Sequence, residues 1–140
     1  MPAAIGAALA EPERTVVCFS GDGSLLMNVQ EFATAAETGA NIKVVLMNNA
    51  TLGLVYQQQT LFYGENIFSS KFAHMPDFPA IARAFGVAAL DLDHEDDPRS
   101  ALASVLKAKG PCLIHCSIDM LQKVYPMVPP GAANRDMIGQ

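Results

Sequence analysis

The chain has 140 residues, of which 51% are hydrophobic and 16% charged, and its formal net charge is −5. This length fits one domain or part of one, and the composition is that of a folded protein with a large core. The acidic balance argues against a nucleic-acid partner. No apolar run approaches the ~18 residues of a membrane span. We therefore expect a cytoplasmic protein that binds neither nucleic acid nor membranes.

The first third of the chain predicts a helix, a strand, a second helix and a second strand. Residues 2–10 begin with Pro2 and continue with small residues that suit a helix. Apolar runs at 15–20 and 42–47 predict buried strands. Helical spacing between them predicts one helix with a single buried stripe, ending at Gly39. The stripe consists of Leu25, Val29, Phe32, Ala33 and Ala36.

The rest of the chain continues the alternation. A helix over 54–62 is followed by an aperiodic stretch at 63–75. Asp77 and Asp97 each precede a helical pattern and are expected N-caps. The first helix buries Phe78, Ile81, Ala82 and Phe85, and the second buries Leu102, Val105 and Leu106. Strands at 87–92 and 112–118 complete an α/β fold of three layers, a mostly parallel sheet with helices on both faces. Residues 119–140, rich in proline, form a tail.

The cysteines and histidines carry no recognisable site. Cys112 and Cys116 fall in one predicted strand, where they lie roughly 13 Å apart at ~3.3 Å per residue. That separation is too large for a shared zinc ion or a disulfide, so we expect buried structural thiols. His74, His94 and His115 match no motif and are expected on the surface or in the core.

Polar residues end two neighbouring strands of the predicted sheet. Asp22 follows the run 15–20, and Asn49 follows the run 42–47. The carboxyl ends of strands in an open α/β sheet border the ligand crevice. Asp22 and Asn49 can therefore converge on one cation, and magnesium favours such oxygen ligands together with phosphate oxygens.

The segment Gly21–Ser24 suits a diphosphate. Gly21 and Gly23 let the backbone turn tightly, and Ser24 lies at a helix start, where free N–H groups attract anions. Two other phosphate motifs are excluded. Leu26 stands where G-x-G-x-x-G needs glycine, and the chain has no Gly-Lys pair for a Walker loop. Either dipeptide alone, Asp-Gly or Asn-Asn, is most often a turn.

Gly-Asp-Gly, residues 24–47 and Asn-Asn together resemble the thiamine-diphosphate binding motif. The wider sequence resembles the large subunits of acetolactate synthase (acetohydroxyacid synthase), especially the isozyme type with Gln-Gln-Gln after the Asn-Asn loop. The matching stretches cover nearly the whole chain: 2–10 (PAAIGAALA), 19–30 (FSGDGSLLMNVQ), 45–49 (VLMNN), 57–59 (QQQ) and 124–133 (VYPMVPPGAA).

The resemblance implies roles for particular residues. It implies that Asp22, Asn49 and the backbone carbonyl of Thr51 bind Mg²⁺. It also implies that thiamine diphosphate contacts the turn and the next helix, and that two residues form the wall of the substrate pocket. The cofactor-binding residues are Gly21, Asp22, Gly23, Ser24, Asn49, Thr51, Gly53 and Leu54, and the pocket residues are Val55 and Gln58.

Gln58 departs from the family pattern. Most of these large subunits have Trp at this position, where the indole favours 2-ketobutyrate over pyruvate as the second substrate. The smaller, polar Gln58 therefore predicts little preference between the two acceptors and weak binding of herbicides that stack on the indole.

The resemblance also implies an activity and what it needs beyond this chain. The reaction decarboxylates pyruvate and condenses it with pyruvate or 2-ketobutyrate, in branched-chain amino-acid biosynthesis. The activating glutamate belongs to another domain, FAD binds largely outside this segment, and the first strand of the fold would precede Pro2. We expect no catalytic residue in this chain, an inactive isolated fragment, an exposed sheet edge and self-association.

The expected partners are the remainder of a large subunit or a complementary chain, a small regulatory subunit, and further copies. Residues 1–118 are the expected thiamine-diphosphate and magnesium domain, and residues 119–140 the tail that packs toward the active site. Two alternatives remain open: the β-type chain of a split thiamine-diphosphate 2-keto acid decarboxylase, and a non-catalytic truncated binding module. The tail VYPMVPPG argues against the first.

Overall fold

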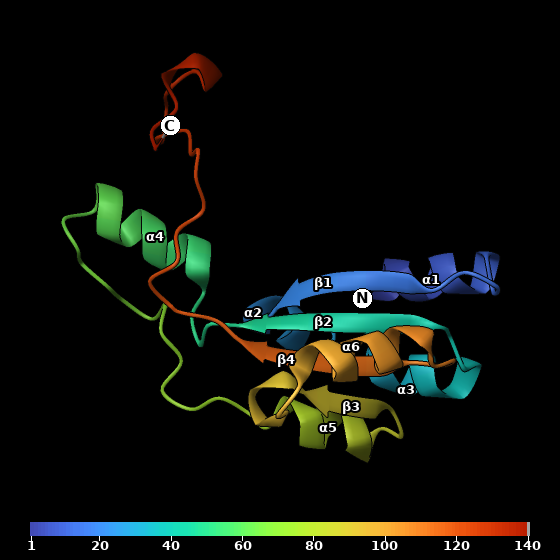
Figure 1. Ribbon diagram of the computed structural model, residues 1–140. Helices are drawn as coiled ribbons and strands as arrows, with labels where there is room; N and C mark the ends of the chain where they lie inside the picture. The colour runs from blue at the N-terminus through green and yellow to red at the C-terminus, as the bar shows by residue number, and fades with distance from the viewer. Residues whose placement is uncertain (140) are drawn as a thin grey trace.

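The computed structural model describes residues 1–139 and contains one four-stranded parallel sheet (Figure 1). Its order is β1-β2-β4-β3, and every neighbouring pair is parallel. This confirms the predicted α/β class. The strands are β1 (Val16–Gly21), β2 (Ile42–Asn48), β3 (Ala88–Asp91) and β4 (Cys112–Ser117). The helices are α1 (Pro2–Ala10), α2 (Asp22–Leu26), α3 (Glu31–Thr38), α4 (Gly53–Phe62), α5 (Phe78–Ala84) and α6 (Pro98–Lys107), with 3-10 turns η1 (Leu92–His94) and η2 (Asn134–Asp136).

Helices cover both faces of the sheet, which gives the expected three layers. Alternate residues of a strand face opposite sides. On one face, residues such as Val44 and Leu46 of β2 form the main core with α1, α3 and α5. On the other face, Ile114 of β4 packs under α6. The two central strands β2 and β4 are buried on both sides and therefore read as continuous apolar runs.

Several helix ends lie where local chemistry predicts them. The side chains of Asp77 and Asp97 accept hydrogen bonds from Ala80 N at 2.9 Å and Ser100 N at 3.1 Å. Both aspartates are therefore N-caps, as expected. Gly39 ends α3 in the left-handed conformation at φ 63°.

The predicted helix between β1 and β2 is wrong in its middle. The chain forms two helices, α2 and α3, separated by turns at 27–30. The interruption rotates α3 relative to α2, so Ala35 is fully buried while Ala33 is exposed. Leu25 and Phe32 keep their predicted buried positions.

Smaller differences lie at element edges. The strand predicted at 87–92 is shorter, because Leu92 begins the 3-10 turn η1. Phe85 and Leu106 were expected in the core but each is 37% exposed, because each lies near the end of its helix.

All three cysteines are free, and Cys112 is buried as expected, whereas Cys116 is only half-buried.

Helix α4 and the tail form an arm beyond the carboxyl ends of the strands (Figure 1). Gln57 on α4 joins the two parts. Its amide donates to Val124 O at 2.9 Å and accepts from Val124 N at 2.8 Å. Met127 and Ile138 then pair in a short antiparallel bridge within the tail. Residue 140, the last of the predicted tail, lies outside the described residues.

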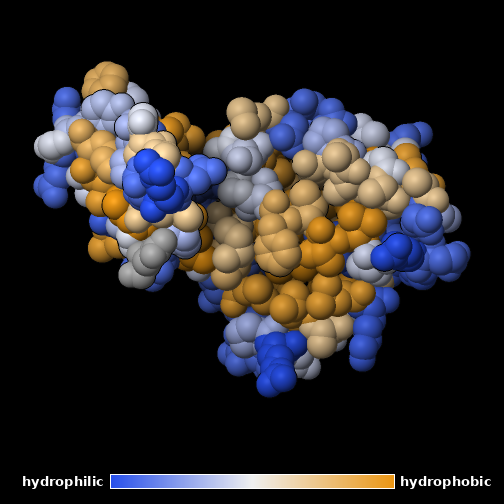
Figure 2. Space-filling model, turned by 90° about the horizontal axis from the view of Figure 1, so that it is seen from above, coloured by the Kyte–Doolittle hydropathy of each residue, from blue (hydrophilic) through white to orange (hydrophobic). Residues whose placement is uncertain are grey.

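Strand β1 is an edge strand with apolar side chains on its outer face. Val17 is 43% exposed and Phe19 is 73% exposed. Seen from the β1 side, the body of the molecule carries a broad hydrophobic area (Figure 2).

Within residues 1–139, no helix combines the length and the apolar character needed to cross a bilayer.

Candidate functional site

A cavity of about 450 Å³ lies at the carboxyl ends of β1 and β2, between the sheet and the arm. Parallel strands place the ends of β1 and β2 side by side, and the register pairs Gly21 with Met47. Three segments contribute the lining: 21–24, 47–57 and 118–124. Ligands bind at this carboxyl-terminal end of the strands in open α/β folds.

Asp22 and Asn49 meet at the floor of this cavity. The Asp22 carboxylate is buried at 2% exposure and accepts hydrogen bonds from Gly23 N at 2.6 Å and Asn49 N at 3.2 Å. The two residues are 27 positions apart in sequence, and the sheet brings them into contact. Among residues 1–139, Asp22 forms no ion pair. A buried carboxylate without a cationic partner is unfavourable unless a cation binds it.

Thr51 lines the same cavity as Asp22 and Asn49. Asn49 Oδ1 accepts a hydrogen bond from Thr51 N at 3.1 Å, which fixes the loop that follows β2. Thr51 is buried at 2% exposure, and its Oγ1 has no hydrogen-bond partner among the described residues. An unpaired buried hydroxyl is costly, so a bound group that pairs with it would stabilise this loop.

Two glycines allow neighbouring side chains of the cavity lining to pack closely against the backbone. A Cβ on Gly23 would lie 2.7 Å from Leu52 Cδ2, and one on Gly53 would lie 3.1 Å from Asn49 Nδ2. At either position a side chain would push a cavity-lining group aside. Both residues therefore permit a close approach of backbone to ligand.

The helix that starts at Asp22 is shorter than predicted. Helix α2 has only five residues, so its dipole is smaller than that of the long helix expected from the sequence. Gly23 N already donates to Asp22. The electrostatic contribution of a helix terminus to anion binding is correspondingly weaker than the sequence suggests.

The three consecutive glutamines of α4 point to three different surroundings. Gln57 is buried and binds Val124 of the tail. Gln59 binds the loop after α4, since it donates to Phe68 O at 2.9 Å and accepts from Ser70 Oγ at 2.6 Å. Gln58 is exposed and borders a second hollow, which it shares with Val55. Of the two predicted pocket residues, only Val55 also lines the main cavity.

Sequence reasoning missed part of the lining. Ile118, Gln122, Lys123 and Val124 enter the cavity wall from the end of β4 and the tail. Lys123 adds a cationic residue to that lining. The resemblance predicts that the tail 119–140 packs toward the active site, but it does not identify these residues, because nothing local shows which part of a proline-rich tail returns to the sheet. Every residue of the predicted cofactor set lines this cavity.

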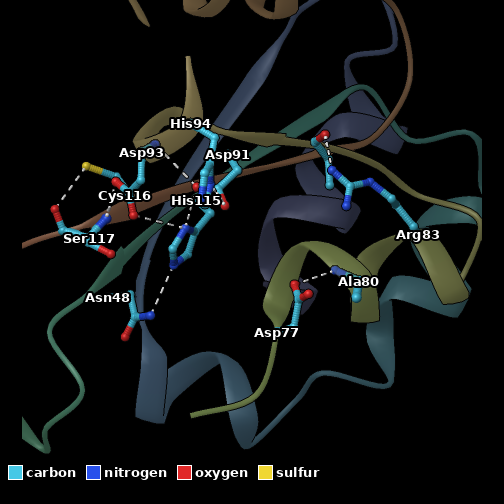
Figure 3. A network of polar contacts seen from close by, with 11 residues as sticks. Asn48, Asp77, Ala80, Arg83, Asp91, Asp93, His94, His115, Cys116 and Ser117 are labelled. Atoms are coloured by element: carbon cyan, nitrogen blue, oxygen red, sulfur yellow. Dashed lines mark hydrogen bonds and ion pairs between the residues drawn. The ribbon is translucent and has the colours of Figure 1, made fainter. Parts of the chain in front are cut away.

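A polar network crosses the same sheet edge at β3 and β4 (Figure 3). His115 Nδ1 lies 2.9 Å from Asp91 Oδ1 and 3.6 Å from Asp93 Oδ2, and His115 Nε2 lies 3.0 Å from Asn48 Nδ2. Burial, the strongest influence, opposes ionisation of Asp91. The hydrogen bonds from His115 and His94 outweigh it and hold the pKa of Asp91 below 3.8.

Asp91, Asp93 and His115 bring ligand-type atoms within 4.8 Å of one another. The hydrogen bonds oppose a metal there. Asn48 Oδ1 accepts from Ala50 N at 3.1 Å, so the NH₂ group of Asn48 faces His115 Nε2. Nε2 must then be the acceptor, and Nδ1 carries the proton that points to Asp91. A protonated Nδ1 has no lone pair to offer a metal ion.

The lowered pKa of Asp91 predicts a pH dependence of folding stability. The favourable interaction of its carboxylate is fully present above pH 3.8 and is lost as the pH falls through the lower pKa of the folded state. We expect the free energy of unfolding of Asp91→Asn to lie below that of the parent chain at pH 6, with the gap closing below pH 3.8. Urea unfolding at a series of pH values measures this. A gap that stays constant down to pH 2 would contradict the assignment.

Comparison with known proteins agrees with this geometry. Residues 1–116 match the family described as thiamine pyrophosphate enzyme, C-terminal TPP binding domain. The chain is 54% identical over 140 residues to the acetolactate synthase isozyme 1 large subunit of Escherichia coli, covering all of this chain and 25% of that protein. It is 45% identical over 138 residues to the isozyme 2 large subunit of the same organism, covering 99% and 25%.

A third relative gives the same result. The acetolactate synthase large subunit of Parasynechococcus marenigrum is 44% identical over 140 residues, covering 99% of this chain and 23% of that protein. The chain thus spans about a quarter of the length of these relatives. The family match covers β1 to β4 and includes Asp22, Asn49 and the cavity floor between them. The chain belongs to the family of C-terminal TPP-binding domains of thiamine pyrophosphate enzymes.

Proposed function

We propose that this chain binds thiamine diphosphate with Mg²⁺ and forms the cofactor-binding part of an acetolactate synthase large subunit. The enzyme would decarboxylate pyruvate and join it to a second 2-keto acid. The observation that carries the proposal is the buried Asp22 carboxylate, which contacts Asn49 at the strand ends and has no cationic partner among the described residues.

The residues at the cavity floor fit a magnesium diphosphate. Asp22, Asn49 and Thr51 offer carboxylate, amide and carbonyl oxygens, which Mg²⁺ prefers, and the diphosphate and water would supply the remaining ligands. Thr51 Oγ1 is a buried hydroxyl that still needs a partner. Gly23 and Gly53 also line the cavity, and a Cβ at either position would displace Leu52 or Asn49, which line it too.

Bound thiamine diphosphate would supply the carbanion-stabilising thiazolium, and the chain would hold and orient it. Gly21, Gly23 and Ser24 present the turn that faces the diphosphate, and Gly53 and Leu54 line the wall beside it. Leu54 is 56% exposed and Val55 44% exposed, so α4 presents apolar surface to the cavity. An apolar wall there would keep water from the bound 2-keto acid.

The tail would close the far side of this site. Gln57 binds Val124 through two hydrogen bonds, which places 122–124 against the cavity. We therefore assign residues 122–124 of the tail to the active-site wall, and Gln58 to the outer rim where the second substrate enters. FAD, the activating glutamate, a small regulatory subunit and further copies are assigned to the remainder of such an enzyme.

Calorimetric titration tests the binding proposal. Thiamine diphosphate is titrated into the 140-residue chain with Mg²⁺ and, in a matched run, with EDTA. We expect binding only when the metal is present, because the acidic chain otherwise repels an anionic ligand. Equal binding in both runs would contradict a metal-bridged site. No binding in either run would contradict the function itself.

We expect no acetolactate from the purified chain supplied with thiamine diphosphate, Mg²⁺ and pyruvate. Among the residues that line the cavity, Asp22 is the only acid, and we assign it to the metal. No carboxylate among the described residues of the cavity lining is therefore free to activate the cofactor by proton transfer. A colorimetric acetoin assay measures the product. Sustained turnover by the chain alone would show that it carries a catalytic group that we have not identified.

A further inference from the structure

Asn48, His115 and Asp91 lie in a row across three strands, although they are far apart in sequence. The register pairs Asp91 of β3 with His115 of β4, and His115 with Leu46 of β2. Asn48 follows Leu46 by two positions and so lies on the same face of the sheet. His115 is 9% exposed and occupies the centre of the row.

Each hydrogen bond in this row fixes the direction of the next. Asp91 is ionised and accepts from His115 Nδ1 at 2.9 Å. The unprotonated Nε2 then accepts from the amide NH₂ of Asn48 at 3.0 Å. The amide oxygen is left facing Ala50 N, from which it accepts at 3.1 Å. Reversing the amide would set donor against donor at Ala50 and break this bond.

The backbone at Ala50 needs this support. Ala50 has φ 54°, a left-handed conformation that is unfavourable for alanine. Its neighbours on either side are Asn49 and Thr51, the residues that reach the cavity floor. Other anchors exist, since Phe72 N donates to Ala50 O and Leu52 N donates to Ser70 O. Asn48 is the side chain that holds the N–H of Ala50 itself.

We propose that Asp91, His115 and Asn48 form a positioning relay that fixes the loop 49–51. None of the three lines the cavity, so they would act through the backbone that carries Asn49 and Thr51. The consequence for cofactor affinity rests on the proposed function, whereas the orientation of the loop does not.

The first test determines directly which ring nitrogen of His115 carries the proton. Nitrogen NMR of the imidazole should show a protonated Nδ1 and an unprotonated Nε2 in the parent chain at pH 7.5. Asn48→Asp keeps an oxygen acceptor for Ala50 N but replaces the NH₂ donor with a second oxygen. We expect a proton to appear on Nε2 of His115 in that variant. A parent chain with the proton on Nε2, or an unchanged ring in Asn48→Asp, would overturn the relay.

The second test measures hydrogen exchange in the loop 49–51 and the affinity for the cofactor. His115→Phe keeps a ring in the same space but cannot hydrogen-bond to Asn48. We expect faster hydrogen exchange at Ala50 N–H and a roughly tenfold weaker Mg²⁺-dependent binding of thiamine diphosphate, since outer-shell partners of metal ligands typically contribute 10–100-fold. The matched control is His94→Phe. His94 also contacts Asp91, but its side chain is 83% exposed and lies off the path to Asn48, so neither measurement should change.

The two tests separate this inference from the proposed function. Unchanged exchange at Ala50 in a folded His115→Phe chain would refute the relay, even if cofactor binds. Faster exchange in His115→Phe, together with a parent chain that binds no cofactor, would support the relay and contradict the proposed function. If His115→Phe does not fold, the tautomer in Asn48→Asp decides the question alone.

Discussion

Replacing Asp22 with alanine is expected to abolish Mg²⁺-dependent binding of thiamine diphosphate, with a loss of about 100-fold or more in affinity. Outer-shell groups already contribute 10–100-fold to metal affinity, and a charged ligand in direct contact contributes more. Asp22 is the only carboxylate among the described residues that line the cavity, so no other lining carboxylate can replace it. Calorimetric titration with and without Mg²⁺ measures the loss.

The same variant should remain folded. Removing the carboxylate leaves Gly23 N and Asn49 N without their acceptor, which costs about 1–3 kcal/mol each at most in a buried setting. It also removes a buried charge that has no cationic partner among the described residues, which offsets part of that cost. Circular dichroism and thermal unfolding of the metal-free variant therefore distinguish loss of the site from loss of the fold.

Asp97→Asn is the matched control for Asp22→Ala. Asp97 also begins a helix and accepts a backbone hydrogen bond, from Ser100 N at 3.1 Å, but it lies outside the cavity. Asparagine caps helices about as well as aspartate, so neither stability nor affinity should change measurably. Retained binding by Asp22→Ala, or equal loss in Asp97→Asn, would show that Asp22 is not the metal ligand.

The cavity floor could be predicted from sequence because its chemistry is local. Apolar runs that end in Gly-Asp-Gly and Asn-Asn identify two strand ends, and parallel strands bring their carboxyl ends together. Asp22 and Asn49 meet for that reason alone. Asp77 and Asp97 were predictable in the same way, since an N-cap depends on the three residues that follow it.

The break between α2 and α3 could not be predicted from periodicity. The apolar residues Leu25, Val29 and Phe32 continue at helical spacing across the turns at 27–30. The spacing of these three residues fits a continuous helix, so it does not reveal the break, which shows only in the exchange of burial between Ala33 and Ala35. The error mattered at the site, because it attributed to Ser24 the dipole of a long helix when α2 has five residues.

The residues missed by sequence reasoning depend on distant partners. Gln57, Gln58 and Gln59 are identical in type, and only the return of the tail and of the loop after α4 gives them different surroundings. His115 likewise matches no motif. Its role follows from the strand order, which places β4 between β2 and β3, and no local pattern encodes that order. The structure buries His115 at 9% exposure.

Replacing Phe32 with alanine is expected to lower the free energy of unfolding by about 3–5 kcal/mol. Phe32 is fully buried and, like Phe78, is one of the largest wholly buried side chains of the described residues. Phe32 anchors α3 in the main core. Its ring centroid lies 6.4 Å from that of Phe85, a residue distant in sequence. Domains are stable by about 5–15 kcal/mol in total, so this one truncation removes a large share. Urea unfolding followed by circular dichroism measures it.

Phe68→Ala separates burial from residue type. Phe68 is 76% exposed, so the same truncation should change the free energy of unfolding by no more than about 0.5 kcal/mol.

Helix α3 belongs to the crossover that joins β1 to β2 and so sets the spacing of Asp22 and Asn49. Yet Phe32 lies outside the cavity lining. The folded fraction of Phe32→Ala should therefore bind Mg²⁺ and thiamine diphosphate with the parent affinity, and added cofactor should raise its melting temperature. Weakened binding by fully folded Phe32→Ala would show instead that the core transmits strain to the cavity floor.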